Sequence, residues 1–359
     1  MVNMTNQDQT QPIPRKKNKK AWLIVGSILL GVAIIACGLY FLWLRPLLNA
    51  PLGEPLDQTK ATEVGDAETV ANEENSDNNN RSSSNAVCGD EDEWVVLVIG
   101  TDYREAEYLY GLADAIRIVK VDFTTPGINV VALPRALLIE NPGPRLDVDT
   151  PILLNQSYFF GTSGMGHFSG SGYGAGALAE TLQTNFGVDF DHYLVVDFNA
   201  FKNFIYLIGG VQIDLPEAVY INDTEEAYFP AGVQILDGEK ALQFARARAL
   251  TSDNIRIDNQ TILLKAIFQR LQDPEVIKYL PDLVDSISKM VLTDVSLADL
   301  QTAICMVDKL SSDSIHFYNP GTDLIETGSV FIPSMDKEMD IFYWDQALVD
   351  WVQTSLWAE

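Results

Sequence analysis

The sequence predicts an α/β domain in which helices cover both faces of a central mixed, mostly buried sheet, preceded by one N-terminal transmembrane helix. The first observation is the run WVVLVIG at 94–100, which has strand length and is apolar throughout, as in a strand covered on both faces. The second is that strand-like and helix-like runs alternate after it, which is typical of layered α/β domains. The third is an uncharged run at 21–44.

The run at 21–44 predicts a membrane anchor. At about 1.5 Å per residue, a helix of this length covers about 36 Å, which exceeds the ~30 Å hydrocarbon layer. Basic residues precede the run and aromatic residues lie near its ends. We therefore expect a cytoplasmic basic tail at 1–20 and an extracytoplasmic location for everything after Arg45. The alternative is a cleaved signal peptide, but the apolar run is long and no small-x-small site closely follows it.

Residues 45–92 predict a disordered acidic stalk. From Gly65 to Asp92 this segment is dominated by Asp, Glu, Asn and Ser, a composition that cannot bury enough apolar surface to offset the cost of ordering. The whole chain has a formal net charge of -26, which argues against nucleic acid as its main partner. Cys88 and Cys305 follow the predicted anchor, where a disulfide is chemically allowed; the sequence leaves a bridge and two free thiols open.

The folded catalytic domain is expected at 93–318, with 319–359 packed on it as an extension. Apolar runs bounded by turn residues predict strands, and a period near 3.6 residues predicts helices. The expected strands are 94–100, 116–122, 128–133, 193–198, 211–215 and 315–318. The expected helices are 175–186, 200–208 with Asn199 as its cap, 239–245, 258–271, 274–290, 297–310 and 345–357. The glycines at 170–174 are interpreted as a flexible insertion at the rim.

Three arginines, Arg246, Arg248 and Arg256, lie within eleven residues of this acidic chain. Arg246 and Arg248 share a face if the backbone there is extended, and Arg256 and Gln260 share a face on a helix. The planar guanidinium group suits paired phosphate oxygens, and a helix N-terminus adds backbone donors. The pattern predicts a pyrophosphate-binding pocket. The alternative is that the arginines only pair with nearby carboxylates.

Two aspartates flank the first pair of expected strands. Asp102 follows the first strand and Asp114 comes just before the second. If these strands run antiparallel, the two carboxylates meet at one edge of the sheet, where Arg135 also ends the third strand. Two carboxylates and a phosphate are common ligands of Mg²⁺. The alternative is that both aspartates are ordinary turn and cap residues.

These motifs occur in an order that resembles the LytR-CpsA-Psr family. The resemblance covers about residues 93–272, and an anchor ahead of the domain also fits. Each motif alone is weak evidence, but their order along the chain is specific. The motifs are Gly-Thr-Asp102-Tyr-Arg104, Asp114, Leu-Pro134-Arg135, Leu-Asn155-Gln-Ser-Tyr158, Tyr193-Leu-Val-Val-Asp197-Phe, Gly209-Gly-Val, Phe229-Pro-Ala-Gly, Leu236-Asp-Gly-Glu-Lys-Ala-Leu, and Arg246-x-Arg248 with Asp253, Arg256 and Gln260.

The resemblance implies a Mg²⁺-dependent extracytoplasmic phosphotransferase. Such an enzyme passes a glycopolymer from a polyprenyl-pyrophosphate carrier to a hydroxyl of peptidoglycan, with the lipid in an apolar groove between sheet and helices. By matching position, Asp102 and Asp114 would hold the metal, and Asp102 and Asp253 are both candidates for the base. The residues that would bind the pyrophosphate are Arg104, Arg135, Arg246, Arg248 and Arg256. Gln260 would assist them, and Asn155 would lie in the same pocket.

Some positions depart from the family's pattern. Ala136 stands in place of the usual acidic residue, Leu112 in place of an arginine, and Ala249 and Leu250 in place of a polar pair. Two other functions stay open, the first because water could replace the acceptor hydroxyl in the same pocket and the second because of Ala136 and Leu112. One is a pyrophosphatase that hydrolyses polyprenyl diphosphates, and the other is a non-catalytic membrane protein that binds or regulates the lipid carrier.

Arg117 lies on the second expected strand, outside the motifs given above. It lies on the same strand face as Val119 and Val121, because side chains alternate along a strand. One interpretation is that it replaces the arginine missing at Leu112. The other is that it is a surface arginine whose stem lies along apolar residues.

Overall fold

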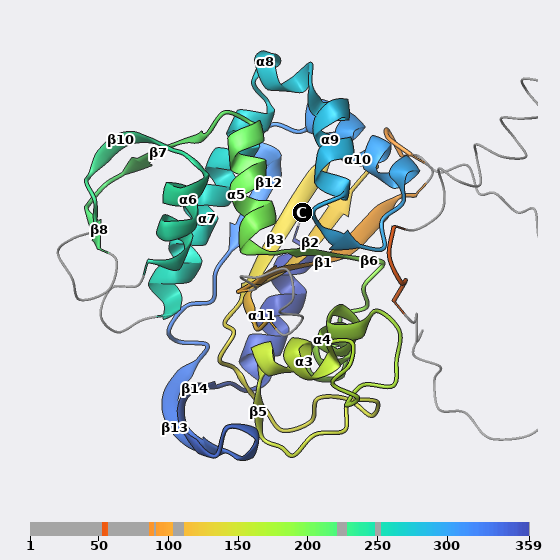
Figure 1. The fold of residues 1–359 in the computed structure, drawn as a ribbon, viewed down its shortest axis with the longest axis vertical. Coiled ribbons are helices and arrows are strands. Elements are labelled where there is room, and N and C mark those ends of the chain that lie inside the picture. Colours follow the sequence, from red (N-terminus) through yellow and green to blue (C-terminus); the bar gives the residue numbers. More distant parts are fainter. Residues whose placement is uncertain are drawn as a thin grey trace, which may run out of the picture. The chain divides into compact units, whose positions relative to one another are not determined.

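A six-stranded mixed sheet forms the centre of the computed structural model (Figure 1). The structure describes residues 52–56, 86–89, 91–102, 111–220, 228–247 and 253–358. The sheet has β1–β2, β2–β3 and β6–β11 antiparallel, and β1–β6 and β3–β12 parallel. In spatial order its strands are β11 (Leu292–Thr293), β6 (His192–Val196), β1 (Glu93–Thr101), β2 (Ala113–Asp122), β3 (Gly127–Leu133) and β12 (Ile315–Tyr318).

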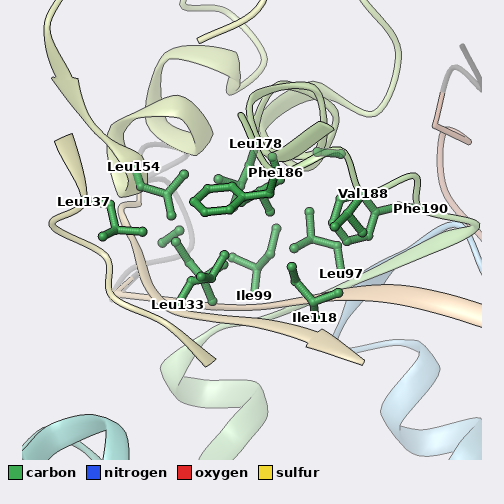
Figure 2. Close-up of a cluster of buried hydrophobic side chains, with 14 of the residues drawn as sticks. Leu97, Ile99, Ile118, Leu133, Leu137, Leu154, Leu178, Phe186, Val188 and Phe190 are labelled. Carbon is green, nitrogen blue, oxygen red and sulfur yellow. The ribbon is translucent and has the colours of Figure 1, made fainter. Parts of the chain in front are cut away.

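One face of the sheet packs against three helices, α3 (Leu154–Gly161), α4 (Tyr173–Phe186) and α11 (Gln346–Leu356). Leu97 and Ile99 of β1 are fully buried on this side. Figure 2 shows the strand side chains and those of α3 and α4 meeting in a continuous apolar layer. The prediction that β1 is a central strand covered on both faces is confirmed, because its alternate side chains meet a second group of helices.

That second group covers the opposite face and has its own apolar core. It contains α5, α6 and α7, whose side chains pack with those of a two-stranded ribbon formed by β7 and β10. Figure 1 shows α5 on the opposite side of the sheet from α3 and α4. The elements are α5 (Phe198–Leu207), β7 (Val211–Leu215), β10 (Gly232–Leu236), α6 (Gly238–Arg246), α7 (Asp253–Leu271), α8 (Pro274–Ile277), α9 (Leu280–Ser288) and α10 (Leu297–Lys309).

The predicted strands and helices are present, with three local corrections. Asp197 rather than Asn199 caps α5, since the Asp197 carboxylate accepts a hydrogen bond of 2.7 Å from the Ala200 backbone N–H. The helix predicted at 274–290 is two helices, α8 and α9. A proline lies in the first turn of α9, and a proline is tolerated there but would break the interior of one continuous helix. The strand β7 lies outside the central sheet and pairs with β10.

The glycine-rich stretch before α4 is not a flexible insertion. Gly174 lies in α4, and a Cβ atom added there would be 2.6 Å from the carbonyl oxygen of Tyr158 in α3. A Cβ added at Gly161 in α3 would be 2.3 Å from that of Ala177 in α4. The glycines therefore allow α3 and α4 to approach closely. The helix α3 was not among the elements predicted from the sequence.

The C-terminal residues pack on the same unit as the sheet. Side chains of α11 enter the first core, and a hairpin of β13 and β14 packs Ile332 and Ile341 against Leu138 and Leu153. The remaining short elements are β4 (Leu138–Ile139), β5 (Ile152–Leu153), β8 (Val219–Tyr220), β9 (Tyr228–Phe229), the 3₁₀ turns Ser312–Ser314 and Pro333–Met335, and the hairpin strands β13 (Glu326–Ile332) and β14 (Lys337–Tyr343).

The N-terminal predictions fall mostly outside the described residues. The anchor predicted at 21–44 and the greater part of the stalk predicted at 45–92 are not described. Within the described part of the chain, no helix has the length and apolarity needed to cross a membrane. Residues 52–56 lie against the domain, where the Tyr193 hydroxyl donates to the Glu54 carbonyl at 3.0 Å, so this short part of the predicted stalk is not disordered.

A disulfide joins Cys88, ahead of β1, to Cys305 in α10. Their Cα atoms are 5.9 Å apart, and the bridge spans 217 residues of sequence. Cys88 is buried beside Trp94, Phe123 and Met306 in a small apolar cluster. Of the two possibilities that the sequence left open, the structure contains the bridge.

We expect Cys305→Ser to lower the free energy of unfolding by about 2–5 kcal/mol, because a covalent bridge over so long a loop restricts the unfolded chain. Urea unfolding of the oxidised proteins measures this difference. The double variant Cys88→Ser/Cys305→Ser should be no less stable than the single variant, since one bridge is lost in both. Equal midpoints for wild type and Cys305→Ser would contradict the prediction.

Candidate functional site

A cavity of about 590 Å³ lies between the sheet and the second group of helices. On the sheet side its wall is formed by the residues of each strand that point away from the first core. The helix side is mostly aromatic and aliphatic. The sheet contributes Val98, Gly100, Ala115, Val119, Ile128, Val130, Leu194, Val196, Ile315 and Phe317, and the helices contribute Phe198, Phe201, Phe204, Leu242, Leu263, Leu264, Ile267, Phe268 and Ile287.

A β-bulge aims Asp114 into the cavity. Gly100 pairs with Ala115 but Thr101 pairs with Ala113, so Asp114 is the extra residue on β2. Asp114 therefore joins Ala115 on the cavity wall although the two are adjacent in sequence. Asp102 comes directly after β1, and its backbone N–H donates to the Leu112 carbonyl at 3.2 Å. The antiparallel pairing assumed in the sequence analysis is confirmed, and it places both aspartates at one edge.

Arg135 also lies at this edge. Its guanidinium group makes a short ion pair with the Asp114 carboxylate. The Arg135 carbonyl accepts a 3.0 Å hydrogen bond from the backbone of Asn155 in α3. Asn155 is only 3% exposed, does not line the cavity, and its side-chain oxygen has no hydrogen-bond partner in the described part of the chain. The backbone bond holds the start of α3 against the end of β3, and Asn155 was predicted to lie in the pocket but does not line the cavity.

Arg246 is the last residue of α6 and lines the cavity. This corrects the expectation of an extended backbone at that position; the chain becomes extended only at Ala247. The guanidinium carbon of Arg246 lies 4.9 Å from the centre of the Phe198 ring, a cation–π contact that orients the group. Phe198 is the first residue of α5, directly after Asp197, which caps that helix and also lines the cavity.

Three polar residues of α7 connect this helix to α6 and to the cavity. Arg256 lies near the start of α7, is 3% exposed and lines the cavity with Gln260. The Gln260 amide donates to the Ala245 carbonyl at 3.4 Å, and the buried Asn259 amide donates to the Ala247 carbonyl at 3.3 Å. These bonds tie the end of α6, with Arg246, to the helix that carries Arg256.

Arg117 is a cavity residue rather than a surface residue. It is 4% exposed and lines the cavity on the same strand face as Ala115 and Val119. Its guanidinium group donates to the Gln260 side-chain oxygen at 2.9 Å and to the Ile116 carbonyl at 3.0 Å. Burial, with Arg256 nearby, lowers its pKa to about 10. The interpretation of Arg117 as a surface arginine is therefore wrong, and its replacement of the arginine missing at Leu112 stays a prediction.

The structure brings five of the predicted site residues together. Asp114, Arg246, Arg256 and Gln260 line one cavity, and Arg135 pairs with Asp114. Arg104 and Arg248 lie outside the described residues, and the side chain of Asp253 is not described. The base predicted as Asp102 or Asp253 is therefore not decided.

The donor set at Asp102 and Asp114 suits a hard divalent cation that also binds a phosphate. One oxygen of each carboxylate is used, by the Leu112 N–H for Asp102 and by Arg135 for Asp114. The second oxygens are not engaged by a described residue. The described residues contain no cluster of three or more metal-binding side chains, so any Mg²⁺ here would need oxygen atoms from substrate or water, as is usual for this ion.

The roles of Asp197, Phe198 and Tyr158 were not predicted from the sequence. Asp197 and Phe198 were recognised only as part of a motif. Their position directly before a predicted helix could have indicated that Asp197 caps this helix. Burial, with Asp197 nearby, raises the pKa of Tyr158 to about 12, so its phenol stays protonated at neutral pH. No pattern in the sequence indicated that Tyr158 and Asp197 would interact.

The fold and the site define a class of proteins: α/β domains with an apolar cavity between sheet and helices, and arginines and aspartates at one end of it. The chain belongs to the LytR_cpsA_psr family, whose pattern matches residues 59–343. This match includes the sheet, the helices α3 and α4, the second group of helices and every described residue of the site, and it ends before α11.

Relatives of this chain include proteins that are named as transferases. The polyisoprenyl-teichoic acid–peptidoglycan teichoic acid transferase TagU of Oceanobacillus iheyensis is 24% identical over 313 residues, 85% of this chain and 85% of TagU. The transferase TagV of Bacillus subtilis, with the same description, is 25% identical over 210 residues, 57% of this chain and 50% of TagV. The crystal structure of B. subtilis TagV matches with a TM-score of 0.56 and 21% identity over 74% of this chain and 95% of that chain, which shows a shared fold.

We expect Val119→Phe to reduce the volume of the cavity without unfolding the protein, because the added ring projects into existing space. Binding of the apolar anionic dye 1-anilinonaphthalene-8-sulfonate, measured by fluorescence, should weaken several-fold. Val233→Phe is the matched control, since Val233 is 64% exposed on β10 and should not affect the dye. Equal dye binding by Val119→Phe and wild type, with unchanged thermal unfolding, would show that the dye does not use the cavity.

Proposed function

We propose that this protein is a membrane-anchored, extracytoplasmic phosphotransferase. It moves a glycopolymer from a polyprenyl-pyrophosphate carrier to a hydroxyl of peptidoglycan. The observation that carries the proposal is that a single cavity is apolar over most of its wall yet lined by Arg117, Arg246 and Arg256, with Asp114 at one end. A polyprenyl diphosphate combines a long apolar chain with adjacent negative charges, and so matches both parts of the cavity.

The proposed reaction is a phosphoryl transfer. The oxygen of the acceptor hydroxyl attacks the phosphorus that carries the glycan, and a new oxygen–phosphorus bond forms. The bond from that phosphorus to the oxygen bridging the two phosphates breaks, and this oxygen leaves with the electron pair as part of polyprenyl monophosphate. The hydroxyl proton passes to a base, for which Asp102 is the described candidate.

The arginines would act mainly by electrostatics and positioning. Phosphoryl transfer requires little covalent chemistry from the protein and depends on neutralising the phosphate oxygens and aligning the two reactants. Arg246 is held by the ring of Phe198, and the end of α6 is held by Asn259 and Gln260, so its guanidinium group is oriented before substrate binds. Mg²⁺ held by Asp102 and Asp114 would add positive charge at the phosphates.

The family and the relatives support this proposal. TagU and TagV are named as transferases from polyisoprenyl-linked teichoic acid to peptidoglycan. The uncharged run at 21–44 supports a single membrane anchor with the N-terminus in the cytoplasm and the domain outside the cell. The Cys88–Cys305 disulfide is consistent with an oxidising location outside the cytoplasm.

The test uses the full chain in detergent micelles with a polyprenyl-diphosphate oligosaccharide, Mg²⁺ and peptidoglycan fragments, with products separated by chromatography. We expect glycan on the acceptor with wild type, and a loss of about 100-fold or more with Arg246→Ala, since a cation that faces the transferred group is removed. Asp114→Asn should have a similar effect. Lys202→Ala, which removes a cation of α5 that pairs with Glu239, is the matched control and should leave the rate unchanged.

The products also separate the other functions. Release of the phosphoglycan with no product on the acceptor would indicate a pyrophosphatase instead. Tight binding of the lipid without turnover would indicate a non-catalytic carrier-binding protein. Unchanged transfer by a folded Arg246→Ala variant would remove the assignment of the site.

A further inference from the structure

The domain holds a short piece of the chain that precedes it. Residues 52–56, the docked segment, pack against the edge of the sheet formed by β6 and β11. The fully buried Tyr193 of β6 donates its hydroxyl to the Glu54 carbonyl at 3.0 Å. Gly53 lies so close to β11 that an added Cβ atom would be 2.6 Å from the Thr293 carbonyl oxygen. The docked segment is therefore part of the domain, although the sequence predicted a disordered stalk there.

The docked segment shortens the connection to the predicted membrane anchor. A stalk that is free over 45–92 would allow the domain to move far from the bilayer. With 52–56 held by the domain, only the seven residues 45–51 separate the predicted anchor from Leu52. A fully extended chain covers at most about 3.6 Å per residue, so Leu52 lies within about 30 Å of the end of the anchor.

This limit restricts which side of the domain can reach lipid. A folded domain of about 270 residues is about 45–50 Å across, as its expected radius of gyration implies. If the side opposite the docked segment lay on the bilayer, Leu52 would be further from it than the connection can reach. The ribbon of β7 and β10, with the exposed side chains of Val233 and Ile235, lies at that opposite side (Figure 1). The connection therefore excludes the ribbon as the lipid-facing surface.

Exposed apolar side chains surround the docked segment. Leu52 at its start, Leu292 of β11 and Tyr173 at the start of α4 are 42–45% exposed. Tyr173 adjoins Gly172, where an added Cβ atom would be 2.9 Å from the side chain of Leu56. Leucine side chains enter the acyl region of a bilayer, and tyrosine rings lie at the level of the headgroups. The chemistry of this surface therefore suits a lipid surface.

The same edge adjoins the apolar cavity. Val291 lines the cavity and directly precedes the exposed Leu292. Leu194, in the β6 strand that pairs with β11, lines the cavity as well. The apolar lining thus comes within one residue of the exposed edge, next to the part of the molecule that the proposed function assigns to the lipid carrier.

We propose that the docked segment holds the β6–β11 edge of the domain against the bilayer, with Leu52, Leu292 and Tyr173 in contact with lipid. This inference rests on the membrane anchor of the function proposed above, and it adds which face of the domain meets the membrane. The chain has a net charge of -26, so the contact depends on apolar side chains and not on attraction to anionic headgroups.

The test measures lipid contact at two positions of the full chain in phosphatidylcholine vesicles. Cys37→Ser removes the one cysteine outside the disulfide, and Leu292→Cys or Val233→Cys then carries a nitrobenzoxadiazole fluorophore. Phospholipids with a nitroxide on the acyl chain quench fluorophores that enter the bilayer. We expect quenching at position 292 to be at least about twofold stronger than at the matched exposed position 233, with blue-shifted emission at 292.

A second variant tests the docked segment itself. Gly53→Val should release it, because the added side chain would collide with the Thr293 carbonyl oxygen, and quenching at position 292 should then fall toward that at 233. Glu54→Ala is the matched control, since the Glu54 side chain is exposed and only its carbonyl takes part in docking. Thermal unfolding shows that each variant is folded when its quenching is compared.

The outcomes separate this inference from the proposed function. If the chain floats with the vesicles and transfers glycan, but position 292 is quenched no more than position 233, only the assigned face is wrong. A blue shift at 292 without quenching would mean that a second copy covers this edge, and would overturn the proposal. Full quenching at 292 in a folded Gly53→Val chain would show that the docked segment does not hold the edge. A chain that does not float with vesicles would remove the anchor, and the proposed function with it.

Discussion

The structure depends on a central sheet that is apolar on both faces. Along β1, Leu97 and Ile99 pack into the first core, and Val98 between them points into the cavity. Each face must be covered, since exposed apolar surface costs about 25 cal/mol per Å². The helices α3, α4 and α11 cover the first face by direct contact. On the second face the helices leave a cavity of about 590 Å³, and a ligand that fills it with apolar groups would complete the burial.

The polar end of the cavity follows from how the strands end. The antiparallel pairing of β1 with β2 brings Asp102 beside the start of β2, and the bulge turns Asp114 into the cavity. Antiparallel pairing of β3 with β2 then brings Arg135 to the same edge. The helices α6 and α7 add Arg246 and Arg256 from the opposite side. In a chain with a net charge of -26, this concentration of arginines in one cavity favours an anionic ligand.

The accuracy of the sequence-based predictions depended on the range of the interactions involved. The strands of the sheet were found because a run such as 94–100 is apolar on both faces, which is a local property. The cap of α5 was misplaced by two residues, because Asp197 and Asn199 are both good caps and only the backbone geometry chooses between them. Gly174 of α4 was misjudged because it packs against Tyr158, a residue of another helix.

The sequence by itself determined the type of domain and the family, and it predicted several of the residues that line the cavity. The order of the motifs and the periodicity of the strands indicate these properties, and both are visible in the sequence without knowing which segments are in contact. Only the tertiary structure decided that Arg117 faces the cavity beside Arg256, that Arg246 ends a helix over Phe198, and that Cys88 meets Cys305. The physical reason is that these contacts join residues from about 50 to more than 200 positions apart, whose distances are set by the packing of the sheet and helices and not by local preferences.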